Sequence, residues 1–165
     1  MKIYVLGGVC SGKTWLTELI SKKLKIPHYN LDDLYFTKKY DEKRSSVKRA
    51  QLIKKIAAKK NWVAEGVYSS WTMPLLQSAD SVVIINPPTS IRIYRFFVRE
   101  FKKKSFFKHK KFLEFVNFTK SAFKYNKKSQ NKGFHHHVSV LKENQIKFKV
   151  LKTKKQIQDF VKSLK

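Results

Sequence analysis

The chain has 165 residues, of which 37 are Lys or Arg and only 11 are Asp or Glu, so its formal net charge is +26. Hydrophobic residues make up 42% of the sequence, which is enough for one folded core and excludes a generally disordered chain. The single cysteine, Cys10, excludes an internal disulfide framework, and every apolar run is far shorter than the roughly 20 residues of a membrane span. We therefore expect one soluble, cytoplasmic domain.

The excess of basic residues has two interpretations. A field of this sign attracts polyanions such as nucleic acid, anionic lipid or nucleotides. However, 32 of the basic residues are lysines and 5 are arginines, and a lysine-rich composition also arises from AT-rich coding sequence. From charge alone we expect at most weak, nonspecific binding of nucleic acid, and we expect no membrane partner.

Segments with strand-like and helix-like patterns alternate along the chain. Apolar, β-rich runs predict five strands, at residues 2–6, 26–31, 61–66, 81–86 and 146–152. Helical periodicity, capping residues and prolines predict helices from 14 to 26, over 45–60, 71–79, after 88, within 108–145 and over 154–164. This order predicts one doubly wound α/β domain, with a parallel sheet and a ligand site at the carboxyl ends of the strands.

The first predicted strand runs directly into GGVCSGKT, which matches the phosphate-binding pattern G-x-x-x-x-G-K-[ST]. In such a loop, glycines bring the backbone close to the phosphates and successive amides donate to them. The residues predicted to bind the nucleotide here are Gly7, Gly8, Ser11, Gly12, Lys13 and Thr14. Lys13 would reach the β- and γ-phosphates, and the Thr14 hydroxyl would bind Mg²⁺. The expected cofactors are therefore ATP and Mg²⁺.

Two adjacent carboxylates, Asp32 and Asp33, follow the second predicted strand. Neighbouring carboxylates repel each other unless a cation or hydrogen-bond donors satisfy them. One of them would bind Mg²⁺ through water, and the other would accept the proton of an acceptor hydroxyl. The alternative is that Asp32 only caps a short helical turn.

A third acidic position, Glu65, ends the third predicted strand and is followed by Gly66. At this edge of the sheet a carboxylate would orient water bound to Mg²⁺, and the glycine would leave room for a substrate. The alternative is an exposed acid at the end of a strand.

Three of the five arginines, Arg92, Arg95 and Arg99, fall within eight residues. Arg95 and Arg99 lie one helical turn apart, and forked guanidinium contacts suit phosphate oxygens. We expect Arg95 and Arg99 to stabilise the charge of a transferring phosphoryl group, with Arg95 also contacting the nucleotide. The alternative is a solvated helix face.

Between residues 96 and 123 the chain places nine of its thirteen Phe residues among lysine runs. The spacing of Phe112, Phe115 and Phe123 predicts an amphipathic helical insertion that covers the site as a lid, roughly over 96–132. A basic, aromatic surface for single-stranded nucleic acid is the alternative.

Three consecutive histidines, 135–137, point in different directions on a helix, so we do not predict a metal site there.

Taken together, these motifs resemble the P-loop kinases of the adenylate kinase and shikimate kinase group. The resemblance rests on GGVCSGKT, IPHYNLDDLYF, WVAEGVYSSW and ADSVVIINPPTSIRIYRFFVRE, and is greatest to bacterial proteins labelled "DNA topology modulation protein". It implies a P-loop NTPase sheet of order 2-3-1-4-5, ATP on the loop and an acceptor under the helices that follow strands two and three. Adenylate kinases carry Asp-Gly-Phe-Pro-Arg after strand three, and this chain lacks that arginine, so an acceptor hydroxyl is favoured over a nucleoside monophosphate.

We therefore predict an ATP-dependent phosphotransferase that acts on a small-molecule, nucleoside or nucleotide acceptor, as a monomer or homodimer. The predicted catalytic residues are Lys13, Asp32, Asp33, Arg95 and Arg99, with Thr14 and Glu65 holding Mg²⁺. The alternative function is a nucleotide-gated protein that binds nucleic acid through its basic surface.

Overall fold

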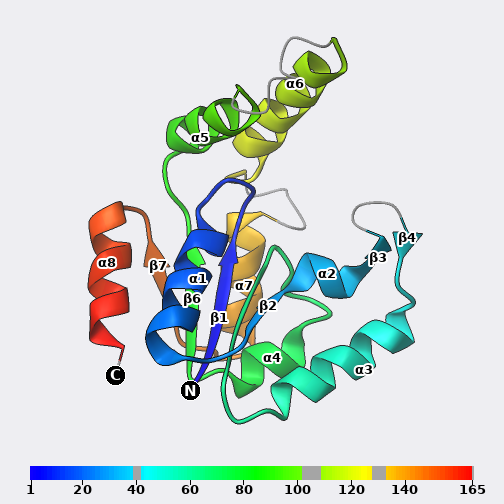
Figure 1. Ribbon diagram of the computed structural model, residues 1–165, viewed down its shortest axis with the longest axis vertical. Coiled ribbons are helices and arrows are strands. Elements are labelled where there is room, and N and C mark those ends of the chain that lie inside the picture. The colour runs from blue at the N-terminus through cyan, green and yellow to red at the C-terminus, as the bar shows by residue number, and fades with distance from the viewer. Residues whose placement is uncertain (39–41, 102–108, 128–132, 165) are drawn as a thin grey trace.

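A five-stranded parallel sheet forms the centre of the computed structural model, which describes residues 1–38, 42–101, 109–127 and 133–164, without the side chains of 38 and 109–115 (Figure 1). The strands are β1 (Lys2–Gly7), β2 (His28–Asn30), β5 (Trp62–Gly66), β6 (Ser81–Ile85) and β7 (Phe148–Leu151). Their spatial order is β2-β5-β1-β6-β7, with parallel pairing throughout. The predicted α/β fold and the order of its five strands are confirmed.

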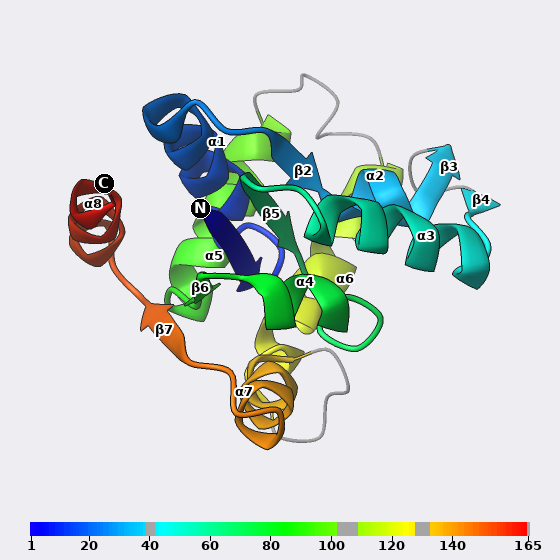
Figure 2. The ribbon, with the colours of Figure 1, turned by 90° about the horizontal axis from the view of Figure 1, so that it is seen from below.

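Helices cover both faces of the sheet (Figure 2). One face carries α1 (Lys13–Leu24) and α8 (Lys154–Ser163), and the other carries α3 (Ser46–Ala57), α4 (Met73–Ser78) and α7 (Phe134–Glu143). Because side chains alternate along a strand, β1 sends Ile3 and Val5 into the first core and Tyr4 and Leu6 into the second. All four are fully buried, so β1 is apolar on both sides.

Local sequence explains where several of these helices begin. The Ser45 hydroxyl accepts a hydrogen bond from the Lys48 amide and caps α3. Thr153 and Gln156 form a reciprocal capping box at the start of α8. Pro74 lies in the first turn of α4, where its missing N–H has no helical partner to lose. The predicted helices are confirmed, and side-chain capping accounts for the starts of α3 and α8.

Two details differ from the predicted elements. The second strand ends at Asn30, and α2 (Leu31–Tyr35) follows at once, capped by the Asn30 side chain, which accepts from the Asp32 amide. The alternative role of Asp32 as the cap is therefore wrong. A small antiparallel pair, β3 (Phe36–Lys38) with β4 (Glu42–Lys43), was not predicted, because two such short strands carry no readable periodicity.

Two helices, α5 (Thr89–Phe101) and α6 (His109–Lys124), stand together above the carboxyl ends of the strands (Figure 1). The rings of Phe96 and Phe118 stack with centroids 3.9 Å apart, and Ala122 is fully buried against them. Residues 102–108 and 128–132 of the predicted lid, and the side chains of Phe112 and Phe115, lie outside the described residues. Within the described ranges, no helix is long and apolar enough to cross a membrane.

His137 on α7 is fully buried, and its Nδ1 lies 3.0 Å from the Ser69 hydroxyl. Its Nε2 has no hydrogen-bond partner in the described part of the chain. Burial, followed by the positive charges of His136 and Lys13, lowers the pKa of His137 to about 4. The imidazole is therefore neutral in the folded protein at neutral pH.

We expect the free energy of unfolding to fall as the pH drops from about 6.5 to about 4, because the unfolded chain takes up a proton on His137 near its ordinary pKa of about 6.5. The loss is on the order of 3 kcal/mol. Urea unfolding at several pH values measures this loss of stability. In His137→Gln the free energy of unfolding should depend less on pH over this range. His135→Gln, at a partly exposed position, is the control. A profile that His137→Gln leaves unchanged would contradict this account.

Candidate active site

The loop between β1 and α1 has the backbone shape of an anion-binding nest. Cys10 and Gly12 both lie in the left-handed region, with φ values of 57° and 101°. Residues in this conformation next to right-handed ones turn successive amides toward the same side, where they bind an anion. At Gly8, an added Cβ would lie 2.5 Å from Nη2 of Arg92, so a larger residue would displace that guanidinium. The loop therefore has a backbone shape that suits an anion.

Lys13 and Thr14 open α1 and face the acidic edge of the sheet. The Lys13 ammonium donates to the Gly8 carbonyl at 3.0 Å, and the Thr14 hydroxyl donates to Oε2 of Glu65 at 3.1 Å. Burial lowers the pKa of Lys13, while the carboxylates of Glu65 and Asp32 act in the opposite direction. The positive charge of Lys13 therefore interacts with the negative charges of both Glu65 and Asp32.

Glu65 is the penultimate residue of β5 and has only 2% of its surface exposed, so the alternative of a solvated acid is wrong. Its Oε1 lies 3.4 Å from Nε2 of His28 but makes no hydrogen bond. That same Nε2 lies 3.0 Å from the hydroxyl of Thr17, which donates to the backbone of α1. His28 thus connects α1 to Glu65. His28 was not among the predicted site residues, although the strand order places β2 beside β5.

The structure separates the two adjacent aspartates. Asp32 lies beside the loop, and its Oδ1 accepts a hydrogen bond of 2.9 Å from the Tyr68 hydroxyl. Asp33 is exposed and does not line the same cavity. Consecutive residues of a helix point about 100° apart, which explains why α2 directs only one of them inward. Tyr68, the partner of Asp32, was not among the predicted site residues.

One cavity of about 510 Å³ brings together most of the predicted side chains. Its polar lining comes from α1, β2, α2, β5, the segment after β5 and α5, with apolar side chains between them. The lining residues are Val9, Cys10, Lys13, Thr14, Asn30, Asp32, Phe36, Glu65, Gly66, Val67, Tyr68 and Arg99. Two carboxylates, two hydroxyls, an ammonium and a guanidinium therefore face one space.

The three arginines of α5 have three different surroundings. Arg95 donates from Nη1 to the Ser11 carbonyl at 2.7 Å and lines a second cavity of about 410 Å³ beside the loop. Arg99 lies at the edge of the 510 Å³ cavity, with its Nε 3.2 Å from Oε1 of Glu100. Arg92 is buried behind the loop and donates to the Val9 carbonyl at 3.0 Å. None of the three is a purely solvated residue.

Comparisons with known proteins agree with this architecture. Over 102 residues the chain is 30% identical to the uncharacterized protein YqaC of Bacillus subtilis (strain 168), a match that spans 61% of this chain and 57% of that protein. No protein-family model matches the sequence. The structure is similar to shikimate kinase from Bacteroides thetaiotaomicron, with a TM-score of 0.55, 16% identity and coverage of 98% and 94% of the two chains.

It is also similar to a gluconokinase from Sinorhizobium meliloti 1021, with a TM-score of 0.55, 15% identity and coverage of 98% and 87%. At such identities the likeness concerns the arrangement of the backbone. The chain therefore has the fold of the P-loop kinases.

Proposed function

We propose that the protein transfers the γ-phosphoryl group of ATP to a hydroxyl of a small acceptor. The observation that carries this proposal is the 510 Å³ cavity, in which Lys13 and Thr14 of the phosphate loop meet Asp32, Glu65 and Arg99 from three other elements. Phosphoryl transfer depends mainly on positioning and charge stabilisation, which this set of groups supplies. The names of the structural neighbours, a shikimate kinase and a gluconokinase, support the same class of reaction.

The residues present fit a magnesium ion. Thr14 and Glu65 lie within hydrogen-bond distance of each other, and the second oxygen of the buried Glu65 makes no hydrogen bond. Hydroxyl and carboxylate oxygens, with water, are the ligands that Mg²⁺ prefers. When bound, the ion neutralises charge on the phosphate oxygens. We assign Thr14 to direct contact with it and Glu65 to contact through water.

The second cavity, of about 410 Å³, suits the base of the nucleotide. Trp15, Arg95 and Lys154 line it next to Gly12, so it adjoins the phosphate loop. An indole and a guanidinium are both planar groups on which a purine stacks. ATP would then lie along the start of α1, with its triphosphate directed into the larger cavity.

On the acceptor side, Asp32 would accept the proton of the attacking hydroxyl. The Tyr68 hydroxyl, which donates to Oδ1 at 2.9 Å, holds that carboxylate in position. Lys13 and Arg99 would stabilise the transferring group, and Arg95 the donor nucleotide. The narrower resemblance to "DNA topology modulation" proteins stays a prediction.

A coupled assay of Mg-ATP consumption tests the proposal. Purified protein is incubated with Mg-ATP and a panel of hydroxylated acids, sugars, nucleosides and nucleotides, and phosphorylated products are detected by mass spectrometry. ADP formation that depends on one acceptor supports the proposal. Binding of Mg-ATP without transfer to any acceptor, across the whole panel, contradicts it.

Asp32→Asn should lower kcat by about a hundredfold with little change in the KM of ATP, because it removes the proton acceptor while keeping the shape. Asp33→Asn is the matched comparison, since its side chain is exposed outside the cavity, and should change kcat by less than about twofold. Steady-state kinetics with the identified acceptor measures both. Equal losses of kcat in the two variants would contradict the assignment of different roles to Asp32 and Asp33.

One structural observation favours the alternative of nucleotide-gated nucleic-acid binding. Tyr94, Phe97 and Phe123 are exposed beside one another along an apolar groove between α5 and α6, and exposed aromatic rings stack on bases. That function requires no phosphoryl transfer. ATP-dependent binding of single-stranded DNA with a steep salt dependence and a high specificity ratio over nonspecific duplex, without any product in the acceptor screen, would favour it over the kinase.

A further inference from the structure

Arg92 is a buried cation to which the proposed reaction assigns no role. Only 2% of its surface is exposed, and it makes no ion pair with an acid among the described residues. A guanidinium stays protonated at neutral pH, and burying a charge without a partner of opposite sign is costly. Other interactions therefore have to offset the cost of burying Arg92.

The guanidinium of Arg92 lies directly behind the phosphate loop. Its Nε donates to the Val9 carbonyl at 3.0 Å. Its Nη2 lies so close to Gly8 that a Cβ added to that residue would be 2.5 Å away. The backbone at the start of the loop is therefore in direct contact with a positively charged side chain.

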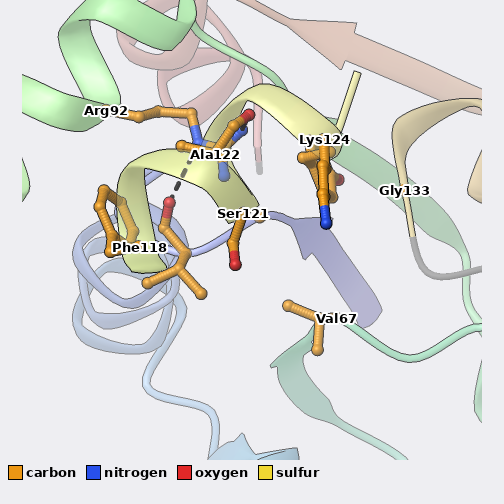
Figure 3. Close-up of a pocket in the computed structure, with 10 residues that line it drawn as sticks. Val67, Arg92, Phe118, Ser121, Ala122, Lys124 and Gly133 are labelled. Atoms are coloured by element: carbon orange, nitrogen blue, oxygen red, sulfur yellow. Dashed lines mark hydrogen bonds between the residues drawn. The ribbon is translucent and has the colours of Figure 1, made fainter. Parts of the chain in front are cut away.

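The same side chain also contacts the end of α6. Nη1 of Arg92 donates to the Ala122 carbonyl at 3.4 Å, and Cζ lies 4.6 Å from the ring centroid of Tyr125. Figure 3 shows Arg92 extending from α5 toward Ala122. Ala122 and Tyr125 are both buried, so they hold the guanidinium against the loop.

The hydrogen bond from Arg92 sets the direction of one loop amide. In a planar trans peptide the C=O and N–H groups point in opposite directions. The Val9 carbonyl shares its peptide unit with the Cys10 N–H, and this carbonyl accepts from Arg92. The Cys10 N–H is therefore directed away from Arg92, toward the face of the loop on which a phosphate would lie.

Arg95 sets the direction of a second loop amide. Its Nη1 donates to the Ser11 carbonyl at 2.7 Å, and this carbonyl shares its peptide unit with the Gly12 N–H. Cys10 and Gly12 are also the loop residues with left-handed backbone. Two arginines of α5 thus hold these peptide units in the direction that an anion-binding nest requires.

The charge of Arg92 also acts on the other side of the loop. Burial lowers the pKa of Lys13, and the positive charge of Arg92 acts in the same direction, so the two cations repel each other. A triphosphate bound to the loop would attract both of them and offset this repulsion. The nucleotide itself would then compensate the buried charge.

We propose that Arg92 is a positioning residue of the phosphate loop, which directs the Cys10 amide toward the triphosphate and attracts the triphosphate through the loop without touching it. This inference rests on the proposed function only as far as nucleotide binding and requires no transfer to an acceptor. It gives Arg92 a role different from those of Arg95 at the base and Arg99 at the transferring group.

The test compares how two ligands bind to the ¹⁵N-labelled full chain in NMR titrations, a non-hydrolysable ATP analogue with Mg²⁺ and adenosine. Adenosine lacks phosphates and would occupy only the cavity of about 410 Å³, which Arg92 does not line. Arg92→Gln removes the charge and the fork, so it should raise the Kd of the analogue at least about tenfold. The Kd of adenosine should change by less than about twofold, whereas a general loss of structure would weaken both ligands alike.

Arg44→Gln is the matched control, because Arg44 also donates to backbone carbonyls, those of Leu34 and Phe36, away from the loop. The substitution removes the same charge from the chain. Both Kd values should therefore stay within about twofold of those of the unchanged protein. Equal increases of the analogue Kd in Arg44→Gln and Arg92→Gln would show that net charge alone is responsible, which overturns the inference.

Arg92→Lys decides if Arg92→Gln does not fold. Lysine keeps the charge but lacks the planar fork that reaches the Val9 and Ala122 carbonyls together, so the Kd of the analogue should rise about threefold with adenosine unchanged. An unchanged Kd of the analogue, or the same loss for adenosine, overturns the role of Arg92. Analogue binding that depends on Arg92, without transfer in the acceptor screen, contradicts the kinase and supports this inference. If the unchanged protein does not bind the analogue, both are wrong.

Discussion

Replacing Lys13 by alanine should lower kcat/KM for Mg-ATP-dependent transfer by about a thousandfold or more. The ammonium lies between the loop and the two acids of the 510 Å³ cavity, where its charge would act on the β- and γ-phosphates. Partial exclusion of water strengthens that interaction, so few other groups can replace it. Initial rates with the acceptor found in the screen, at several ATP concentrations, measure the loss.

Lys22→Ala provides the control, because Lys22 is exposed on the same helix and contributes equally to net charge. Its activity should match that of the unchanged protein. Lys22→Ala should unfold at the same denaturant concentration as the unchanged protein, within the usual small effect of a surface substitution. If Lys13→Ala kept full activity, the phosphate loop would have no catalytic role and the proposed reaction would be wrong.

Glu65→Gln should lower kcat by about a hundredfold and raise the Mg²⁺ concentration needed for half-maximal rate. Glutamine keeps the shape of the side chain, so the Thr14 hydroxyl can still donate to its amide oxygen, as it does to Oε2 at 3.1 Å. What disappears is the negative charge that would orient water on the metal. The readout is the rate as a function of total Mg²⁺ at fixed ATP.

Glu18→Gln, an exposed position on α1, is the matched control and should leave the Mg²⁺ dependence unchanged. A Glu65→Gln variant with normal Mg²⁺ dependence but lower stability would assign the buried carboxylate a structural role instead. In that case its contact with His28, at 3.4 Å, would be the interaction to examine.

The acidic residues of the site show what sequence patterns can and cannot predict. That Asp32 and Glu65 lie near the phosphate loop follows from the rule that parallel strands present their carboxyl ends at one edge. The separate positions of Asp32 and Asp33 depended on where α2 begins, and that was set by the Asn30 cap, which the strand-like run 26–31 concealed. Adjacent residues of equal chemistry can be assigned different roles only after the local backbone is known.

The buried groups were the hardest to predict. His28 reaches Glu65 because β2 lies beside β5, and Tyr68 reaches Asp32 from beyond the end of β5. Both residues lie in segments that carry the kinase resemblance, IPHYNLDDLYF and WVAEGVYSSW, but the spacing of residues within these segments gave no signal for their contacts. Arg92 was visible as a member of an arginine cluster, but its burial was not, since helical periodicity places it on the same face as Phe96 without indicating what covers that face.

The sequence by itself determined the fold class, the sheet of five strands and the phosphate loop, because these depend on local periodicity, capping and glycine conformations that short segments encode. Only the tertiary structure decided which acid faces the cavity and how the three arginines of α5 divide between two cavities and a buried position. These features arise where segments that are distant in the sequence pack together. Which side chains become buried there, and which lie close to one another, depends on that packing and not on the pattern of either segment.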